Sequence, residues 1–337
     1  MAGIYIHIPF CKQACHYCDF HFSTNLDRRE ELVAALVHEI KLQANYLQHE
    51  VIDTIYFGGG TPSLLKAQEI ETLLGAIHSQ HSVNPKAEVT LEANPDDLKK
   101  VKLRELYSFG INRLSIGIQS FDDSILKFFN RAHNSEEAMQ CIRDARHAGY
   151  QNLSLDLIYA VPGQDHNQWI KNIAKAIQLE PEHLSSYTLT IEEKTAFGKW
   201  AKTGKLKGVD EKFAAEEFEI LMDELEKAGF EHYEISNFCL PGFQSKHNSN
   251  YWKQEKYLGI GPSAHSYDGD SRQFNVSNNA LYQKSLNEGK VPFEVEVLSR
   301  ENKINEYIFT TLRTSWGCQL DYLKESLDYD LVLNQSR

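Results

Sequence analysis

The chain has 337 residues, of which 42% are hydrophobic, so it is long enough for one large domain and a smaller one. Its net charge of −12 argues against a general nucleic-acid-binding protein. No apolar run approaches the roughly 20 residues of a membrane span, and Met1-Ala2-Gly3 lacks the basic residues that begin a signal peptide. We therefore expect a cytoplasmic protein, with a peripheral position at the inner face of the membrane as the alternative.

Strand and helix patterns alternate over the first 190 residues. The predicted strands are residues 4–8, 54–57, 89–92, 113–117, 153–157 and 184–189. The predicted helices between them are residues 27–48, 67–78, 98–109, 135–148 and 169–179. Glycine follows two of these helices, at Gly110 and Gly149, where a left-handed residue ends a helix at little cost. Such units predict a parallel sheet with helices outside it, either an open barrel or a doubly wound sheet.

The pattern changes after residue 190. The charged stretch 191–209 is predicted to be a linker, and residues 210–228 form a strong helix pattern. Residues 233–267 are rich in aromatic residues, His, Asn and Gly, a composition that suits a loop forming a site. A helical pattern returns from Arg300. We therefore predict a core domain at 1–190, a linker at 191–209 and a C-terminal domain at 210–337.

Three cysteines follow the first predicted strand at the spacing C-x3-C-x2-C, as Cys11, Cys15 and Cys18. A loop this short can direct three thiolates to one point, and soft thiolate ligands suit an iron–sulfur cluster. A closed cluster or a structural zinc site normally has four protein ligands, but no fourth cysteine lies nearby. The spacing therefore predicts a metal site with one open position. A zinc site completed by His16 or His21 is the alternative.

Polar residues and glycines mark the expected carboxyl ends of several other strands. These are Gly58-Gly59-Gly60-Thr61-Pro62, Glu92, Gln119 and Asp156. In barrels and in open parallel sheets alike, ligands bind at this edge. A glycine triplet lets the backbone approach a ligand closely, because a Cβ would collide there. Taken alone, such a triplet more often marks a tight turn without a ligand.

The cysteine loop is similar to the cluster loop of radical S-adenosylmethionine (SAM) enzymes, in which SAM binds the open iron of a 4Fe–4S cluster. Five stretches together resemble, more narrowly, the oxygen-independent coproporphyrinogen III oxidase-like group of that superfamily. They are YIHIPFC at 5–11, FGGGTP at 57–62, EANP at 92–95, SIGIQSF at 115–121 and LDLIY at 155–159. The resemblance implies an α/β fold, with a radical SAM partial (β/α)6 TIM-type barrel and a smaller mixed α+β C-terminal domain.

The resemblance also implies roles for individual residues. The cluster ligands would be Cys11, Cys15 and Cys18. The residues expected to bind SAM are Gly59, Gly60 and Thr61 at its methionine end, Glu92 at its ammonium, Arg131 at its carboxylate, and Gln119 and Asp156 at its ribose. Arginine suits the carboxylate because its guanidinium binds one bidentately. Tyr5 and Tyr17 match positions that border the ligand and the cluster.

Two branches of the group differ at positions that this chain shows. The oxidase proper has a cysteine two residues after the third cluster cysteine and a long segment ahead of its cluster. Here the position two residues after Cys18 is occupied by Phe20, and the cluster motif begins at Cys11. The branch of haem chaperones has Asp-Phe after the cluster motif and a downstream H-N-x-x-Y-W motif. This chain has both, the second as HNSNYW at 247–252. The chain thus resembles the chaperone branch, which continues beyond the point where this chain ends, so part of the C-terminal domain is expected to be missing.

The resemblance predicts a protein that binds haem and transfers it to acceptor haem proteins, such as components of a respiratory chain. His247 is the expected haem ligand, because neutral imidazole binds haem iron. Taken alone, a histidine in a loop is usually a surface or hydrogen-bonded residue. His265 is a weaker second candidate for the iron, or a residue of the SAM cavity. The alternative function is a radical SAM oxidoreductase acting on coproporphyrinogen III or another tetrapyrrole. We expect a 4Fe–4S cluster and SAM in either case, haem with the chaperone function, and no nucleic-acid partner.

Overall fold

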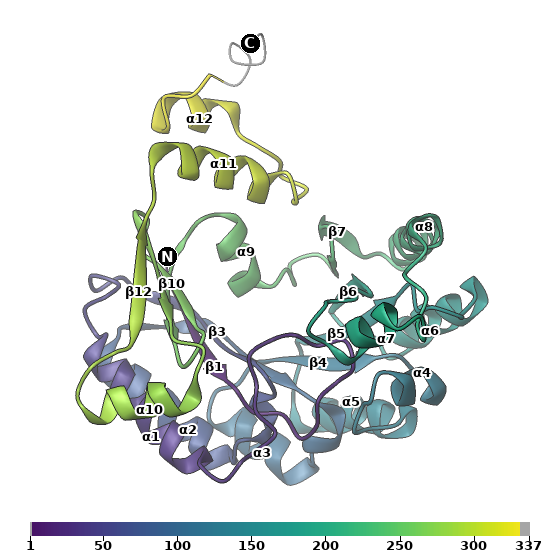
Figure 1. Ribbon diagram of the computed structural model, residues 1–337, viewed down its shortest axis with the longest axis horizontal. Coiled ribbons are helices and arrows are strands. Elements are labelled where there is room, and N and C mark those ends of the chain that lie inside the picture. Colours follow the sequence, from purple (N-terminus) through teal and green to yellow (C-terminus); the bar gives the residue numbers. More distant parts are fainter. Residues whose placement is uncertain (1, 331–337) are drawn as a thin grey trace.

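The computed structural model describes residues 2–330, which form one 12-stranded sheet with helices on both sides (Figure 1). The first six strands are parallel neighbours in chain order. They are β1 (Ala2–Ile8), β2 (Ile52–Gly59), β3 (Val83–Ala93), β4 (Arg113–Gln119), β5 (Leu153–Tyr159) and β6 (His183–Thr188). The predicted alternation of strands and helices is therefore confirmed for this part of the chain.

Helices connect these strands and cover the convex side of the sheet (Figure 1). They are α1 (Arg29–Leu42), α2 (Ala67–Gln80), α3 (Lys100–Ser108), α4 (Asp123–Phe128), α5 (Ser135–Ala148) and α6 (His166–Gln178). Two short 3-10 turns, η1 (Pro62–Leu64) and η2 (Pro95–Asp97), follow β2 and β3. As expected, Gly149 ends α5 in the left-handed conformation at φ 107°. Asn134 caps the start of the same helix.

The side chains of β1 show how the two faces of the sheet differ. Ile4, Ile6 and Ile8 are fully buried in the apolar core against the helices. Tyr5 and His7 alternate with them, so they lie on the opposite, concave face. The concave face of the barrel thus carries polar and aromatic side chains, whereas the core lies between the sheet and its outer helices.

The second half of the chain extends both ends of this sheet. Its elements begin with α7 (Ala196–Lys202), α8 (Glu211–Lys227), β7 (Glu231–Glu234), β8 (Asn237–Cys239) and α9 (Lys246–Trp252). They continue with β9 (Lys256–Ile260), β10 (His265–Tyr267), β11 (Ser271–Asn275), α10 (Asn279–Asn287), β12 (Phe293–Val297), α11 (Arg300–Thr311) and α12 (Leu320–Ser326). β8 pairs antiparallel with β6, and β9 pairs parallel with β1.

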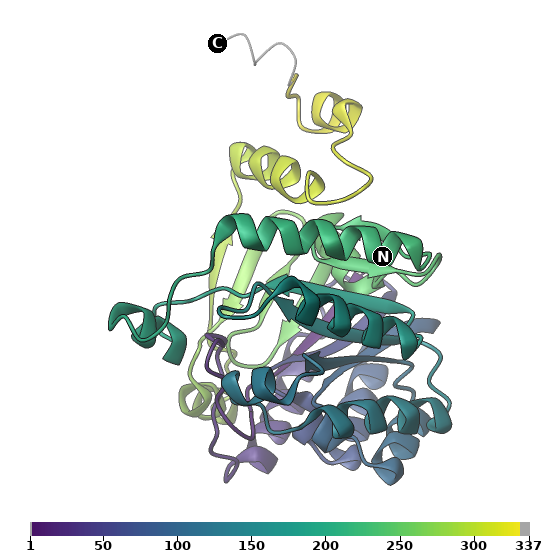
Figure 2. The same cartoon turned by 90° about the vertical axis from the view of Figure 1, so that its right-hand side faces the viewer.

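The sheet order is β12-β11-β10-β9-β1-β2-β3-β4-β5-β6-β8-β7, so within residues 2–330 the two ends of the sheet, β12 and β7, do not pair and the barrel stays open. The predicted fold class, a partial (β/α)6 barrel with a smaller α+β part, is confirmed. Figure 2 shows α11 and α12 beyond the end of the sheet, on the side away from α1–α3, in agreement with Figure 1.

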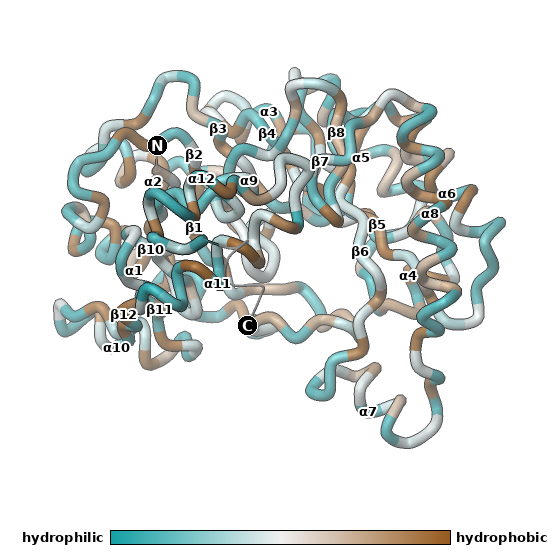
Figure 3. Tube along the Cα trace, turned by 90° about the horizontal axis from the view of Figure 1, so that it is seen from above, coloured by the Kyte–Doolittle hydropathy of each residue, from teal (hydrophilic) through white to brown (hydrophobic). Residues whose placement is uncertain are grey.

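Two features of the second half differ from the sequence-based expectation. Residues 233–267 were predicted as a loop, but they contain the end of β7, the strands β8, β9 and β10, and α9. The charged stretch 191–209 contains α7, which stands out from the body of the molecule in Figure 3. The predicted domain boundary near 190 stays a prediction, and residues 331–337 of the predicted C-terminal domain lie outside the described residues.

Candidate functional site

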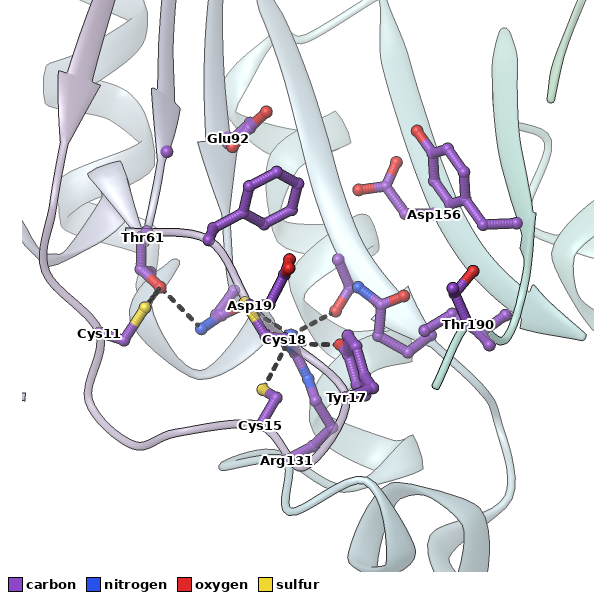
Figure 4. Close-up of a pocket in the computed structure, with 18 of the residues that line it drawn as sticks. Cys11, Cys15, Tyr17, Cys18, Asp19, Thr61, Glu92, Arg131, Asp156 and Thr190 are labelled. Atoms are coloured by element: carbon purple, nitrogen blue, oxygen red, sulfur yellow. Dashed lines mark hydrogen bonds between the residues drawn. The ribbon is translucent and has the colours of Figure 1, made fainter. Parts of the chain in front are cut away.

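A cavity of about 480 Å³ opens at the carboxyl ends of the parallel strands (Figure 4). This volume lies within the range of small-molecule binding sites. Residues of the cysteine loop form one wall, and the ends of β2, β3, β4, β5 and β6 supply the opposite wall. The cavity therefore lies where the strand-end residues were expected to meet.

The cysteine loop connects β1 to α1 and is held by hydrogen bonds to a turn after α4. The Gln13 side-chain amide donates to the carbonyl of Asn130 over 2.6 Å, and the Asn130 amide donates back to the carbonyl of Ala14 over 2.7 Å. The Cys11 amide donates to the carbonyl of Ser23 over 3.0 Å. These bonds fix the path of the loop, so the three thiols face the cavity in a defined arrangement.

The outer side of the loop packs against α7. The ring of His16 lies 4.8 Å from that of Trp200, centroid to centroid, and its Nδ1 is 2.8 Å from the carbonyl oxygen of Phe128. The amide of Phe197 donates to the carbonyl of His16 over 2.9 Å. The stretch predicted as a linker therefore supports the cysteine loop from outside.

All three loop cysteines are free thiols that line the cavity. Burial raises the pKa of Cys11 and raises that of Cys18 to about 11, so a thiolate at either position would need a cationic partner, such as a metal ion, to form in this cavity. Two donors lie beside the sulfurs: the Thr61 hydroxyl is 3.5 Å from Cys11 Sγ, and Nη1 of Arg131 is 3.4 Å from Cys15 Sγ. Hydrogen bonds of this kind tune thiolate-bound iron.

The three thiols of the cysteine loop line the same cavity. Within residues 2–330, no three His, Cys, Asp or Glu side chains are arranged to hold one metal ion. His21, an expected alternative zinc ligand, instead has its Nε2 2.8 Å from the side-chain oxygen of Asn279.

Two carboxylates face the cavity from neighbouring parts of the sheet. Burial raises the pKa of Glu92 on β3 to about 7 and that of Asp156 on β5 to about 6. Tyr56 donates a hydrogen bond to Oε1 of Glu92 over 2.7 Å, and Ser115 donates to Oδ1 of Asp156 over 3.2 Å. Burial opposes ionisation of both carboxyl groups, so a cationic ligand in the cavity would stabilise their charged forms.

Arg131 connects the cysteine wall to the strand ends (Figure 4). Its Nη2 donates to the side-chain oxygen of Asn94 over 2.6 Å and to the carbonyl of Gly117 over 2.7 Å. Nη1 lies near Cys15 and is 3.5 Å from the Tyr17 hydroxyl, while Nε, buried, has no partner in the described residues. The guanidinium is thus held in place by contacts with the cysteine loop on one side and with the strand ends on the other.

The glycines after β2 leave space that a side chain would fill. Gly59 has φ of +108°, a conformation that L side chains rarely adopt. A Cβ on Gly60 would lie 2.6 Å from the carbonyl oxygen of Phe10. The backbone of the cysteine loop and that of the β2 turn therefore lie too close together for a side chain at residue 60, while the predicted close approach of this turn to a ligand stays a prediction.

The sequence of this chain is similar to those of known radical SAM proteins. The model of the radical SAM superfamily matches residues 5–176. The heme chaperone HemW of Lactococcus lactis is 38% identical over 93% of this chain and 82% of its own length, and HemW of Bacillus subtilis is 36% identical over 94% and 84%. The chain belongs to the HemW family of radical SAM proteins.

The fold agrees with a solved structure outside the HemW branch. Coproporphyrinogen III oxidase (HemN) from Escherichia coli superposes with a TM-score of 0.85 over 97% of this chain and 79% of its own, at 22% identity. At this level of identity the likeness shows the shared fold alone.

Most of the residues expected at the site meet in this one cavity of the HemW-family chain. Those that line it are Cys11, Cys15, Tyr17, Cys18, Gly59, Gly60, Thr61, Glu92, Gln119, Arg131 and Asp156. Tyr5 is not among the lining residues, and its hydroxyl lies 3.1 Å from Nδ1 of His7. His265, which was expected as an alternative cavity residue, does not line it either.

His247 of the H-N-x-x-Y-W motif is buried on the concave face of the barrel rather than in an exposed loop. It is 1% exposed, and both ring nitrogens have partners. Nδ1 is 2.8 Å from the Thr54 hydroxyl, and Nε2 is 2.9 Å from the Tyr251 hydroxyl. Burial lowers its pKa to about 3, so the ring is neutral. His247 as a haem ligand stays a prediction, and one of these two hydrogen bonds must break before iron can bind to the ring.

The rest of the motif borders a smaller cavity. Tyr251 and Trp252 line a space of about 170 Å³, together with Tyr257, Tyr267 and Arg272. The guanidinium of Arg313 lies over the ring of Trp252 at 4.9 Å. This cavity is below the usual range for small-molecule sites, so a tetrapyrrole would need it to widen.

Sequence reasoning assigned no role to several lining residues. Asn94, which orients Arg131, occurs in a quoted motif but had no role there. Phe20 is 70% exposed and lines the cavity, so the position that distinguishes the two branches lies at the site itself. Thr188 ends β6, and Leu189 and Thr190 follow it. These three lining residues had no distinctive composition, although their place at a strand end was a signal.

Proposed function

We propose that this chain binds haem and transfers it to acceptor haem proteins, using a radical SAM scaffold with a 4Fe–4S cluster and SAM. Close similarity to proteins named heme chaperone HemW along nearly the whole chain carries this proposal. The presence of HNSNYW at 247–252 supports it from the sequence side.

The cavity residues fit a cluster and SAM in complementary positions. Cys11, Cys15 and Cys18 would hold a 4Fe–4S cluster, which supplies electron transfer when bound. Across the cavity, Glu92 would accept the ammonium of SAM, Arg131 would bind its carboxylate, and Asp156 with Gln119 would hold the ribose hydroxyls. Gly59, Gly60 and Thr61 would contact the methionine end, and Tyr17 would border the cluster.

Haem is the proposed cargo, and His247 is its proposed iron ligand. Since Nε2 bonds Tyr251 in this structure, haem binding requires the Tyr251 hydroxyl to move away and the adjoining cavity to widen. The ring is already neutral, which is the form that binds iron. Respiratory-chain haem proteins are the proposed acceptors.

A haem titration of the reconstituted protein tests the ligand. His247→Ala should remove the Soret shift and stop transfer to an apo-acceptor, whereas Tyr251→Phe should tighten binding by removing a competing hydrogen bond. The net value of such a bond, about 0.5–1.5 kcal/mol, corresponds to roughly 2–13-fold. His183→Ala is the matched control, because His183 is equally buried and bonds Ser154 and Tyr233 at 2.7 Å each.

Three results would count against the assignment. Unchanged haem affinity and spectrum in His247→Ala and in His247→Ala/His265→Ala would show that neither histidine binds the haem iron. Equal losses of haem binding in His247→Ala and His183→Ala would show that the loss comes from a less stable fold and not from a missing iron ligand. Formation of protoporphyrinogen from coproporphyrinogen III with SAM and a reductant would favour the alternative, a radical SAM oxidoreductase, despite Phe20 at the cavity.

A further inference from the structure

A continuous series of contacts joins the large cavity to α9 through the inside of the barrel. Glu92 faces the cavity and accepts the hydroxyl of Tyr56 at 2.7 Å. The ring of Tyr56 stacks on that of His247, with centroids 4.9 Å apart and an interplanar angle of 22°. His247 in turn bonds Tyr251 and Thr54. Only one side chain, Tyr56, therefore separates the carboxylate of the cavity from the histidine of the motif.

Two glycines show how closely this series is packed. A Cβ on Gly58 would lie 2.8 Å from the Tyr5 ring, 3.0 Å from the Tyr56 ring and 3.2 Å from Glu92 Oε1. A Cβ on Gly3 would lie 2.7 Å from the Thr54 hydroxyl and 3.3 Å from the His247 ring. Both sites therefore require glycine for space. Rings packed at this density cannot shift independently of one another.

The charge of Glu92 decides how firmly Tyr56 is held. Burial raises its pKa to about 7, so at neutral pH the group is divided between acid and carboxylate. A bound cation favours the carboxylate, and a hydrogen bond to a carboxylate is shorter and stronger than one to a neutral group. Tyr56 would then be held firmly against the ring of His247. That ring has to break one of its hydrogen bonds and move before it can bind iron.

We propose that Tyr56 couples the two sites, so that SAM bound at Glu92 lowers the affinity of His247 for haem. This inference rests on the proposed function, since it takes SAM and haem as the two ligands. Coupling between binding sites is reciprocal, so haem lowers the affinity for SAM by the same factor. SAM would therefore favour release of the cargo, and Tyr56 would be a positioning residue that contacts neither ligand.

The coupling is measured as the ratio of haem dissociation constants with and without saturating SAM, on holoprotein with its cluster. Wild type should bind haem at least about fivefold more weakly with SAM, the lower end of typical coupling. Tyr56→Phe keeps the stacked ring and loses the hydroxyl, so its ratio should approach one. Tyr150→Phe is the matched control and should keep the wild-type ratio, because Tyr150 is fully buried and bonds Leu103 outside the barrel. A wild-type ratio of one, tighter haem binding with SAM, or the same ratio in Tyr56→Phe overturns the proposal.

A second measurement needs no haem. In protein labelled with ¹³C at histidine Cε1 and carrying an oxidised cluster, SAM should shift the His247 resonance, identified by its loss in His247→Ala. The shift should vanish in Tyr56→Phe. A His247 resonance that SAM does not shift would refute the coupling but not the proposed function. Absence of haem binding under every condition would refute the proposed function, and the effect of SAM on the His247 resonance could still be measured.

Discussion

Glu39 should make the stability of this protein fall as pH rises through neutrality. The residue is fully buried in α1, where its carboxylate accepts the Gly261 amide at 2.7 Å, the Asn275 side-chain amide at 2.6 Å and the Tyr282 hydroxyl. It thereby ties the first helix to the turn after β9, to β11 and to α10. Burial outweighs these donors and raises its pKa from 4.5 to about 7.

Proton linkage gives the direction and the size of the change in unfolding free energy with pH. Between pH 4.5 and 7 the folded state holds the proton of Glu39 while the unfolded state has lost it. The stabilisation is thus complete below the unfolded pKa and is lost as pH rises through the folded one. The full loss is about 3 kcal/mol at about 1.4 kcal/mol per pKa unit, of which about 1.3 kcal/mol falls between pH 6 and 8.

The assay is urea unfolding of wild type and Glu39→Gln at several pH values from 6 to 8, without SAM. The difference between the two unfolding free energies should change by about 1.3 kcal/mol over this range, with wild type losing more. Glu31→Gln, at an exposed position of the same helix that pairs with Arg28, should run parallel to wild type. Parallel curves for wild type and Glu39→Gln would refute the reasoning.

Three further changes probe the cavity. Cys15→Ala should abolish bound iron and sulfide after anaerobic reconstitution, and Cys141→Ala, in α5, should leave them intact; retained iron in Cys15→Ala would contradict the ligand assignment. Asp156→Ala should weaken SAM binding by about 1.5–3 kcal/mol in calorimetry, the range for hydrogen bonds to charged groups, and unchanged binding would remove its role. Gly60→Ala places a Cβ 2.6 Å from a backbone oxygen and should lower both the melting temperature and SAM affinity. Gly75→Ala meets nothing within 4 Å and should stabilise helix α2 by about 0.5–1 kcal/mol, so equal effects of the two would refute the steric argument.

The barrel and the edge that holds the cavity were predictable because their signals are local. Alternating strand and helix patterns identify the parallel units, and parallel strands bring their carboxyl ends to one edge. Glu92 and Asp156 are far apart in sequence, but each lies near the carboxyl end of a predicted strand, so their meeting could be expected. Their raised pKa values could not, because burial depends on the walls that other segments supply.

The second half was harder to predict because its contacts are distant in sequence. The pairing of β9 with β1 has no local signature, and the composition of 191–209 resembles a linker although Trp200 packs on His16. His247 occurs in a polar, glycine-rich stretch that is typical of a loop. Its burial depends on Thr54 and on the space beside Gly3, which only the folded barrel brings to it.

The position of β1 in the sheet has a consequence for biosynthesis. β1 leaves the ribosome before the other described strands, yet one of its two edges is completed only by β9, which begins at Lys256. At 5–20 residues per second, the roughly 250 intervening residues take about 12–50 seconds to make. During that interval the strand that leads into the cysteine loop has an open edge, which is a template for unwanted pairing. We therefore expect the nascent chain to depend on early pairing with β2, and the thiols to be open to metal delivery or oxidation before the C-terminal strands arrive.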